Sequence, residues 1–540
     1  MPKGVILATS STEPGSAGYP QIGRTPMKQV ARTLALVLLV ALASGALQER
    51  VARETVYLDV VERIKEEGLE RSHLPELFHH LLDRIGPRLT GSPGYKRAAE
   101  WSMTQMAAYG LQDVRFESWG PFGRGWEEVS YSGNMVEPFA RPLTGRAGPW
   151  TGSTQGAQRG PAIYLDVEEE ADLAKYRGQL RGAWILMDRA DDFRPKSAGP
   201  TLRATADQLL TPPAATPGPG RPQLSPEEMQ QRQAEMQARQ ALAARVEEML
   251  QEEEVTGFLY RSSMSLGAIR TRGSGSRQAG APHGPPRITL INEDYSMLYR
   301  LSANGAPAVV EFDVQNRFFE DDLNGYNVLG EYRGTDLAHQ YVILGGHLDS
   351  YHVGTGATDN AAGAIVMLEA VRILNELGLR PRRTIKVAFW GGEEQGLIGS
   401  REYLNAHADK HDNISVYLNI DNGTGRLRGI WNQSNEQVTP IFEQLLFPFR
   451  DLGVVAVRHG NTGSTDHVAF DRVGLPGFNF IQDPMAYGST YHSNLDTYEA
   501  ISLEDLQQAA VVVASTAYHL AMRDEMLPRK PAEVQGPPRR

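Results

Sequence analysis

The spacing of apolar residues changes along this chain and predicts three kinds of region. Residues 57–115 carry leucine, isoleucine and phenylalanine three or four positions apart, which is typical of amphipathic helices. Residues 136–320 show short apolar runs between glycine-rich turns, which predict strands. From residue 324, apolar strands alternate with helices, and this alternation predicts an α/β domain layered around a largely parallel sheet.

The elements of the alternating region follow from its apolar runs and turn residues. Each predicted strand is a short, nearly continuous apolar run, as expected for strands buried on both faces. Each predicted helix is longer and has apolar residues at helical spacing. We expect strands at residues 341–344, 384–390, 414–420 and 477–481, and helices at 361–377, 397–407 and 503–522.

The first residues, 1–46, resemble a leader. Met27 and Lys28 begin a basic stretch, residues 34–42 are continuously apolar, and small residues at 41–46 offer a cleavage site. This is the pattern of a secretory signal peptide, and the apolar run is shorter than the ~20 residues that a membrane span needs. We therefore expect a secreted or periplasmic protein that starts at Met27 and meets the membrane only through its export signal.

Residues 200–255 form an unusual stretch within the strand-rich region. A proline-rich segment at 211–222 is followed by Ser225-Pro226-Glu227-Glu228, a capping box with proline at the first helical position. This motif predicts a helix to about Glu254. Its apolar positions are too sparse for a coiled-coil seam, so we interpret it as a solvated helix.

Composition narrows the chemistry that the chain can perform. Of its 540 residues, 41% are hydrophobic and 22% charged, which excludes a mostly disordered chain and a polytopic membrane protein. The net charge of −11 argues against nucleic acid as a partner. The chain has no cysteine, so any metal must be held by histidine, aspartate and glutamate.

Candidate metal ligands follow the predicted strands and turns. Ligands bind beyond the carboxyl ends of the strands in open α/β sheets, so these side chains can converge. Two metal ions that share a bridging carboxylate need about two further ligands each, and imidazole with carboxylate suits Zn²⁺. Asp359 would bridge, His347 and Asp421 would complete one site, and Glu394 and His492 the other.

Glu393 precedes Glu394, and one of the two acids can face the metal while the other faces water. Glu393 would then be the general base. Each residue alone has an ordinary explanation: the glutamates suit a helix N-terminus, Asp359 a helix cap, and His347 a simple hydrogen bond. The occurrence of all of these types in order, each after its own strand or turn, favours the metal site.

Five motifs resemble a known family, the co-catalytic zinc peptidases that include secreted aminopeptidases, glutamate carboxypeptidase II and carboxypeptidase Q. The resemblance covers about residues 55–525 and implies a zinc-peptidase-like, three-layer α/β sandwich with a mixed, largely parallel sheet, plus an inserted β-rich protease-associated domain. The motifs are Gly346-His347-Leu348-Asp349-Ser350, Thr358-Asp359-Asn360-Ala361-Ala362-Gly363, Trp390-Gly391-Gly392-Glu393-Glu394-Gln395-Gly396, Asn419-Ile420-Asp421 and Tyr491-His492-Ser493.

The resemblance also implies a division of the chain into domains. The expected parts are an N-terminal part of the peptidase domain at 47–135, the inserted domain at 136–320 with its excursion at 200–255, the catalytic domain at 321–525, and a disordered tail at 526–540. Relatives occur as monomers or dimers, so the resemblance allows a homodimer.

The family's metal ligands and base correspond to the residues already assigned, and the resemblance adds further roles. It implies that Asp349 holds His347 through the other ring nitrogen, although a plain turn residue would also suit this position. Tyr491 would donate to the tetrahedral oxyanion, or would simply pack. A cis peptide is expected at Asp359–Asn360. Asp466 would support the pocket or contact the substrate amine, although a plain loop hydrogen bond would also suit this position.

The predicted function is therefore a zinc-dependent exopeptidase that uses two Zn²⁺ ions per chain and cleaves short peptides. Two alternatives come from other classes. A glutaminyl cyclase-like acyl transferase needs only one metal, and a catalytically inactive binding relative would have lost ligands and base. The sequence keeps His347, Asp421 and Glu393, which speaks against both alternatives. The sequence does not determine which end of the peptide is recognised.

Overall fold

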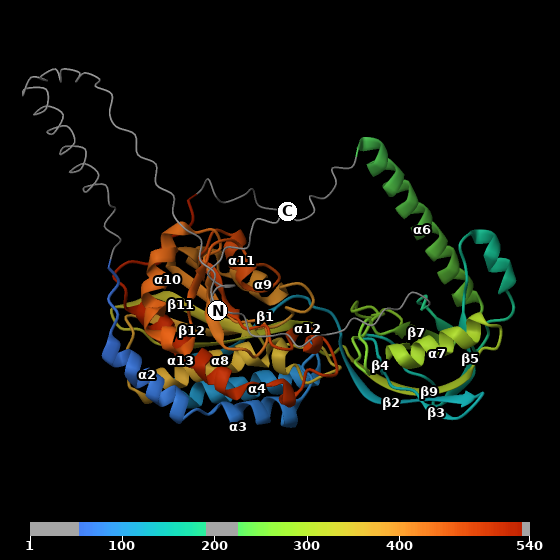
Figure 1. The fold of residues 1–540 in the computed structure, drawn as a ribbon, viewed down its shortest axis with the longest axis horizontal. Helices are drawn as coiled ribbons and strands as arrows, with labels where there is room; N and C mark the ends of the chain where they lie inside the picture. The colour runs from blue at the N-terminus through green and yellow to red at the C-terminus, as the bar shows by residue number, and fades with distance from the viewer. Residues whose placement is uncertain (1–52, 191–224, 532–540) are drawn as a thin grey trace, which may run out of the picture. The chain divides into compact units, whose positions relative to one another are not determined.

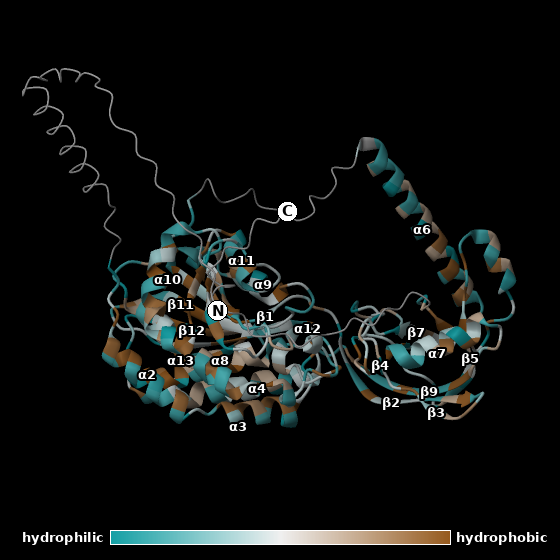
Figure 2. Cartoon of the chain, viewed as in Figure 1, coloured by the Kyte–Doolittle hydropathy of each residue, from teal (hydrophilic) through white to brown (hydrophobic). Residues whose placement is uncertain are grey.

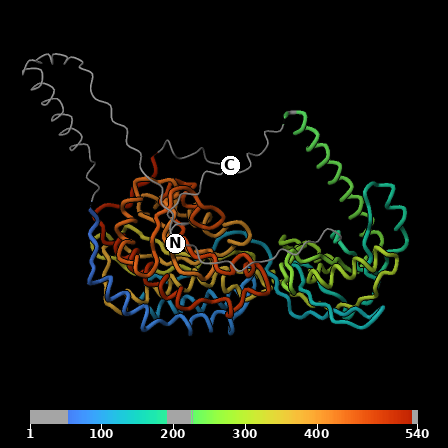
Figure 3. Tube along the Cα trace, viewed as in Figure 1, coloured from blue at the N-terminus to red at the C-terminus, as the bar shows by residue number. Residues whose placement is uncertain are grey.

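The structure is a computed structural model that describes residues 53–190 and 225–531. The predicted leader at 1–46, the predicted start at Met27 and the proline-rich segment at 211–222 lie outside the described residues. From Glu54 onward the described residues form one compact unit. Two eight-stranded sheets organise it. In Figure 3 the blue start of the described chain lies among its orange and red segments, while the cyan to yellow-green segments lie together.

The first sheet is mixed, with a parallel centre. Strands β12, β11, β13 and β16 run parallel, and β10 and β14 join them antiparallel. In spatial order the strands are β1 (Gln112–Trp119), β10 (Gly325–Tyr332), β12 (Arg383–Trp390), β11 (Leu337–His347), β13 (Ile414–Asn419), β16 (Gly477–Gln482), β14 (Leu427–Trp431) and β15 (Ala456–Arg458).

Helices cover both faces of this sheet because its strands are apolar on both sides (Figure 1). Along β11, Val342 and Leu344 pack into the larger core while Ile343 faces the smaller one, as the period of two requires. The larger core is closed by α2 (Leu58–Glu70), α3 (Leu74–His79), α4 (Pro93–Ala108), α8 (Ala362–Glu376), α10 (Thr439–Leu446) and α13 (Leu503–Met522), and the smaller by α9 (Ile398–Ala406) and α11 (His467–Arg472). The predicted layered α/β fold is confirmed.

The second sheet is also mixed and lies between residues 125 and 319. Its parallel part is β5–β6–β7–β8, and α7 (Asn292–Ala303) packs on it. Its order is β3 (Arg141–Pro142), β2 (Gly125–Glu137), β9 (Val309–Phe319), β5 (Gln158–Tyr164), β6 (Trp184–Leu186), β7 (Gly257–Arg261), β8 (Arg287–Leu290) and β4 (Gly145–Ala147). Its identity as a protease-associated domain stays a prediction.

The helix predicted after Ser225 is present as α6 (Pro226–Glu252). The Ser225 hydroxyl accepts from the Glu228 amide, and the Glu228 carboxylate accepts from the Ser225 amide, so both halves of the capping box are formed. Most of its side chains are exposed and hydrophilic, as the predominantly teal colour of the helix in Figure 2 shows.

Three sequence predictions need correction. The helical region ends at Ala108, because residues 112–119 alternate between the two sheet faces and pair with β10 as a strand. Strand β2 of the second sheet begins at Gly125, before the predicted boundary at 136. The tail is not disordered from 526: Leu527 is buried, and Lys530 pairs with Asp471.

The described helices were also compared with the requirements of a membrane span. None within residues 53–190 and 225–531 is both long and apolar enough to cross a bilayer.

Candidate metal centre

The candidate ligands meet where three parallel strands of the first sheet end. His347 is the last residue of β11 and lies opposite Trp390, the last residue of β12. Strand β13 pairs with the other side of β11, so Asp421, two residues past its end, comes to the same edge. Parallel pairing of neighbours therefore brings side chains from distant parts of the sequence to one place.

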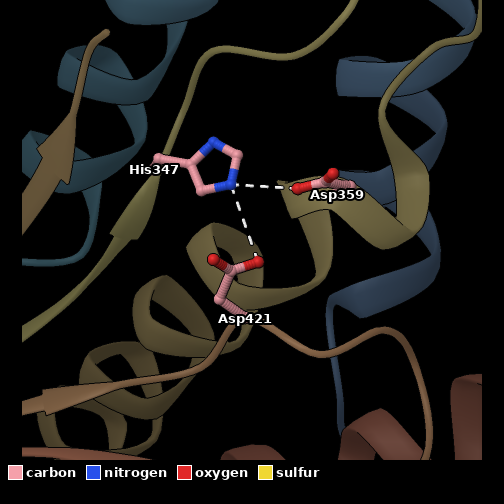
Figure 4. A group of neighbouring side chains, drawn as sticks. All are labelled: His347, Asp359 and Asp421. Atoms are coloured by element: carbon pink, nitrogen blue, oxygen red, sulfur yellow. Dashed lines mark hydrogen bonds and ion pairs between the residues drawn. The ribbon is translucent and has the colours of Figure 1, made fainter. Parts of the chain in front are cut away.

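The first triad consists of His347, Asp359 and Asp421, which Figure 4 shows converging on one point. The Nε2 atom of His347 is 3.0 Å from Oδ1 of Asp359 and 3.6 Å from Oδ1 of Asp421. All three side chains are buried. Nδ1 of His347 donates to the Asp349 carbonyl oxygen at 2.9 Å, which leaves Nε2 directed at the two carboxylates.

The second triad shares Asp359. Nε2 of His492 is 3.0 Å from Oδ2 of Asp359 and 2.8 Å from Oε2 of Glu394. The two oxygens of Asp359 therefore face different histidines, one in each triad. This is the arrangement that a carboxylate bridging two cations requires.

The donor set fits divalent cations. Oε1 of Glu394 and Oδ1 of Asp421 are buried and have no hydrogen-bond partner within residues 53–190 and 225–531. Buried polar atoms are normally satisfied, so orphaned oxygens at the meeting point of both triads indicate positions for an ion. Two imidazoles with carboxylates and no thiolate form a donor set that suits Zn²⁺.

The charged groups at the site also favour bound cations. Burial disfavours the charged form of His347, but Glu393 and Asp421 outweigh it and hold its pKa well above the ordinary value. Burial also opposes the charge on His492, yet Asp359 and Glu394 raise its pKa to about 10. Burial, together with Asp359, raises the pKa of Glu394 to about 8. The negative charges of the clustered carboxylates are thus not fully balanced, and bound cations would balance them.

Asp349 contacts the other ring nitrogen of His347, and it also binds a second part of the site. Its backbone carbonyl, rather than its carboxylate, accepts the hydrogen bond from His347; the ring nitrogen lies 3.6 Å from the carboxylate. The carboxylate instead accepts from the amides of Glu393 and Glu394, each at 3.3 Å, and from the Thr90 hydroxyl at 2.8 Å. Asp349 therefore fixes the turn that carries the candidate base and one candidate ligand.

The segment around Asp359 has the expected cis peptide between Asp359 and Asn360, which is confirmed. The Asn360 side chain donates to the Ile420 carbonyl at 2.8 Å and accepts from the Gly363 amide at 2.9 Å. It thereby ties the start of α8 to the end of β13, next to Asp421.

Two further residues support this segment, and the sequence analysis missed both. Asp496 accepts from the amides of Thr358 and Asp359 at 2.6 and 3.2 Å. Arg88 is fully buried and donates to the carbonyls of Leu348 and Gly356, on either side of the intervening loop. An aspartate or arginine in a loop carries no local pattern that could have identified this role.

Glu393, Tyr491 and Asp466 lie around the two triads. Glu393 and Tyr491 line a cavity of about 450 Å³ together with the second triad and Asp421. Oε2 of Glu393 is 4.0 Å from Nε2 of His347, so the carboxylate borders the candidate metal positions without belonging to either triad. Burial, reinforced by Asp421, raises the pKa of Asp466 to about 7.

Comparisons with known proteins identify similar sequences. Residues 327–517, which include all five candidate ligands, match the model of peptidase family M28. The chain is 27% identical to carboxypeptidase Q of Mus musculus over 484 residues, which is 89% of this chain and 91% of the relative.

Solved structures show the same fold. A peptidase M28 precursor from Shewanella amazonensis superposes with a TM-score of 0.62 at 23% identity, covering 88% of this chain and 98% of that chain. The zinc aminopeptidase BSAP from Bacillus subtilis superposes with a TM-score of 0.55 at 21% identity, covering 84% and 96%. Residues 327–517 are therefore similar to peptidase family M28, and by this similarity and that to carboxypeptidase Q the chain is a metallopeptidase.

Proposed function

We propose that this metallopeptidase is a secreted or periplasmic exopeptidase that hydrolyses short peptides with two Zn²⁺ ions and Glu393 as general base. The observation that carries the proposal is the position of Asp359, whose two oxygens each lie 3.0 Å from a different histidine. A carboxylate placed in this way would be able to bind two ions at once. His347 and Asp421 would hold one ion, and Glu394 and His492 the other.

The protein's own residues divide the work of hydrolysis. Bound zinc supplies Lewis-acid polarisation and lowers the pKa of water. The carboxylate of Glu393 removes a proton from the attacking water and delivers it to the nitrogen of the leaving amine. The backbone amides of Glu393 and Glu394 donate hydrogen bonds to the Asp349 carboxylate. These bonds keep the Glu393 side chain beside Glu394, the candidate metal ligand that follows it.

Tyr491 is proposed to act on the other side of the reacting carbonyl. It lines the same cavity as Glu393, and a phenol there can donate a hydrogen bond to the oxygen that becomes negative in the transition state. Such a donor lowers the barrier without changing how tightly the ground state binds.

The presence of two triads favours this function over the alternatives. A one-metal acyl transferase of the glutaminyl cyclase type would not need His347 and Asp421 near a second histidine. A binding protein without catalysis would not need Glu393 beside both triads. Export rests on the leader pattern at residues 1–46 alone.

The proposal is tested with free, N-blocked and C-blocked dipeptides, with zinc counted per chain. We expect two zinc ions, activity that a chelator abolishes and zinc restores, and a loss of about 10²–10⁴-fold in kcat for Glu393→Ala. Glu127→Ala, which removes an acid of the second sheet, is the matched control and should retain full activity. Full activity in Glu393→Ala, or one zinc per chain without hydrolysis, would contradict the proposal.

A further inference from the structure

A loop of the second sheet contacts the segment that carries His492. The loop follows β7, and Ile269 exchanges two hydrogen bonds with Asn494: its amide donates to the Asn494 side chain at 2.6 Å, and its carbonyl accepts from the Asn494 amide at 3.1 Å. The next residue, Arg270, forms an isolated antiparallel bridge with Ser493. A segment far away in the sequence is thus joined to the candidate active site by backbone pairing.

The side chain of Arg270 continues this contact toward Tyr491. Its Cζ atom lies 4.1 Å from the centroid of the Tyr491 ring, within the range of a cation–π interaction. Its Nη2 atom donates to the backbone carbonyl of the same tyrosine at 2.9 Å. One guanidinium group therefore holds both the ring and the main chain of Tyr491.

The residue that Arg270 holds lies in the wall of the catalytic cavity. The Tyr491 ring centroid is 4.8 Å from that of His492 and 5.2 Å from that of Tyr487. His492 itself has a φ of 57°, in the left-handed region that few residues other than glycine adopt. Arg270 adds to these local contacts one from outside the segment of Tyr491.

We propose that Arg270 is a positioning residue for the peptidase reaction, which holds the Tyr491 hydroxyl where it can donate to the developing oxyanion. The inference rests on the proposed function of Tyr491. It makes the loop of the second sheet a part of the catalytic apparatus, in addition to any effect of that sheet on access to the cavity. Arginine suits this role because its planar group can stack on a ring and donate in its own plane at the same time, which lysine cannot do.

The chain offers a matched control two residues away. Arg272 lies on the same loop, but its guanidinium donates to Asp188 within the second sheet, at 2.6 Å. Arg272→Ala removes an arginine from the loop without removing a contact to Tyr491. A loss that came only from loosening the loop would affect both variants.

The test is a double-mutant cycle in the zinc-loaded full chain, with Arg270→Ala, Tyr491→Phe and the double variant, beside Arg270→Lys and Arg272→Ala. We expect Arg270→Ala to lower kcat by roughly 10- to 100-fold, the scale that a small misplacement of a catalytic group costs, with KM changed less than about twofold. In the Tyr491→Phe background the same change should have little further effect. Arg270→Lys should recover part of kcat, and Arg272→Ala should resemble the parent.

Several results would overturn the inference. These are a parent-like kcat in Arg270→Ala, an equal loss with and without the Tyr491 hydroxyl, or an equal loss in Arg272→Ala. Zinc content is measured for every variant, and a fall in bound zinc that accounts for the lost activity also refutes positioning through Tyr491. Failure of the proposed function is separate, because it appears as an inactive parent or as an active Glu393→Ala variant. If Arg270→Ala does not fold, Arg270→Lys in both backgrounds completes the cycle.

Discussion

Replacing Asp349 with asparagine tests whether its carboxylate holds the turn that carries Glu393 and Glu394. The carboxylate accepts three hydrogen bonds: from the Thr90 hydroxyl at 2.8 Å and from the two glutamate amides at 3.3 Å. Asparagine has nearly the same shape but only one oxygen. At least one of the three donors would therefore face an NH₂ group that cannot accept.

The magnitude follows from this count. A buried donor that loses its acceptor costs about 1–3 kcal/mol, which corresponds to roughly a 5- to 150-fold change in rate if it appears in the transition state. The backbone carbonyl of Asp349 still accepts from His347 in the variant, so the first triad keeps its hydrogen bond. We therefore expect the loss to fall on kcat more than on zinc content.

The assay compares kcat, KM and zinc per chain for Asp349→Asn and the parent enzyme on one dipeptide. Asp322→Asn is the control, because Asp322 also accepts from an amide and a hydroxyl but lies in an exposed loop. The control should stay within about twofold of the parent, since exposed donors can turn to water. A parent-like kcat in Asp349→Asn would show that the carboxylate does not hold the turn.

Three further predictions concern stability and metal binding. Burial lowers the pKa of His352 to about 4, so the unfolded state takes up a proton before the folded state does as pH falls below about 6.5. The free energy of unfolding of the parent should therefore fall by up to about 3 kcal/mol between pH 6.5 and 4, measured by urea unfolding. The His352→Gln variant should lose less over the same range. Arg372→Met should cost about 3–5 kcal/mol in the same assay, because it leaves the buried carboxylate of Glu369 without its charged partner, whereas Glu67 keeps its ion pair with Arg71; an unchanged midpoint would contradict this. Gly363→Ala should weaken zinc binding in a chelator competition, because its Cβ would lie 2.2 Å from the Ile420 carbonyl oxygen; parent-like affinity would show that the loop yields.

The sequence allowed much of the fold around the site to be predicted, for a physical reason. Strands such as β12 and β13 are largely apolar runs, and the ligand candidates lie at or just past their ends, so local patterns carry both the element and the residue. Parallel pairing then places the ends of β11, β12 and β13 side by side. The prediction failed at residues 112–119, where a strand follows α4 after only three residues. Polar and apolar residues alternate only from Asp113 to Glu117, a run short enough to be taken for the end of the helix.

The supports of the site could not be predicted, because their roles depend on contacts that no local pattern encodes. Arg88 and Asp496 are far from residues 347–359 in the sequence, yet both bind the backbone of that segment. Neither spacing nor charge distinguishes them from ordinary loop residues. The role of Arg270 is still harder to predict from the sequence, because it lies in a loop of the second sheet and contacts Tyr491 only in the folded chain. Residues that supply the chemistry follow secondary structure, whereas residues that position them follow tertiary contacts, so the latter appear only once the chain is seen in three dimensions.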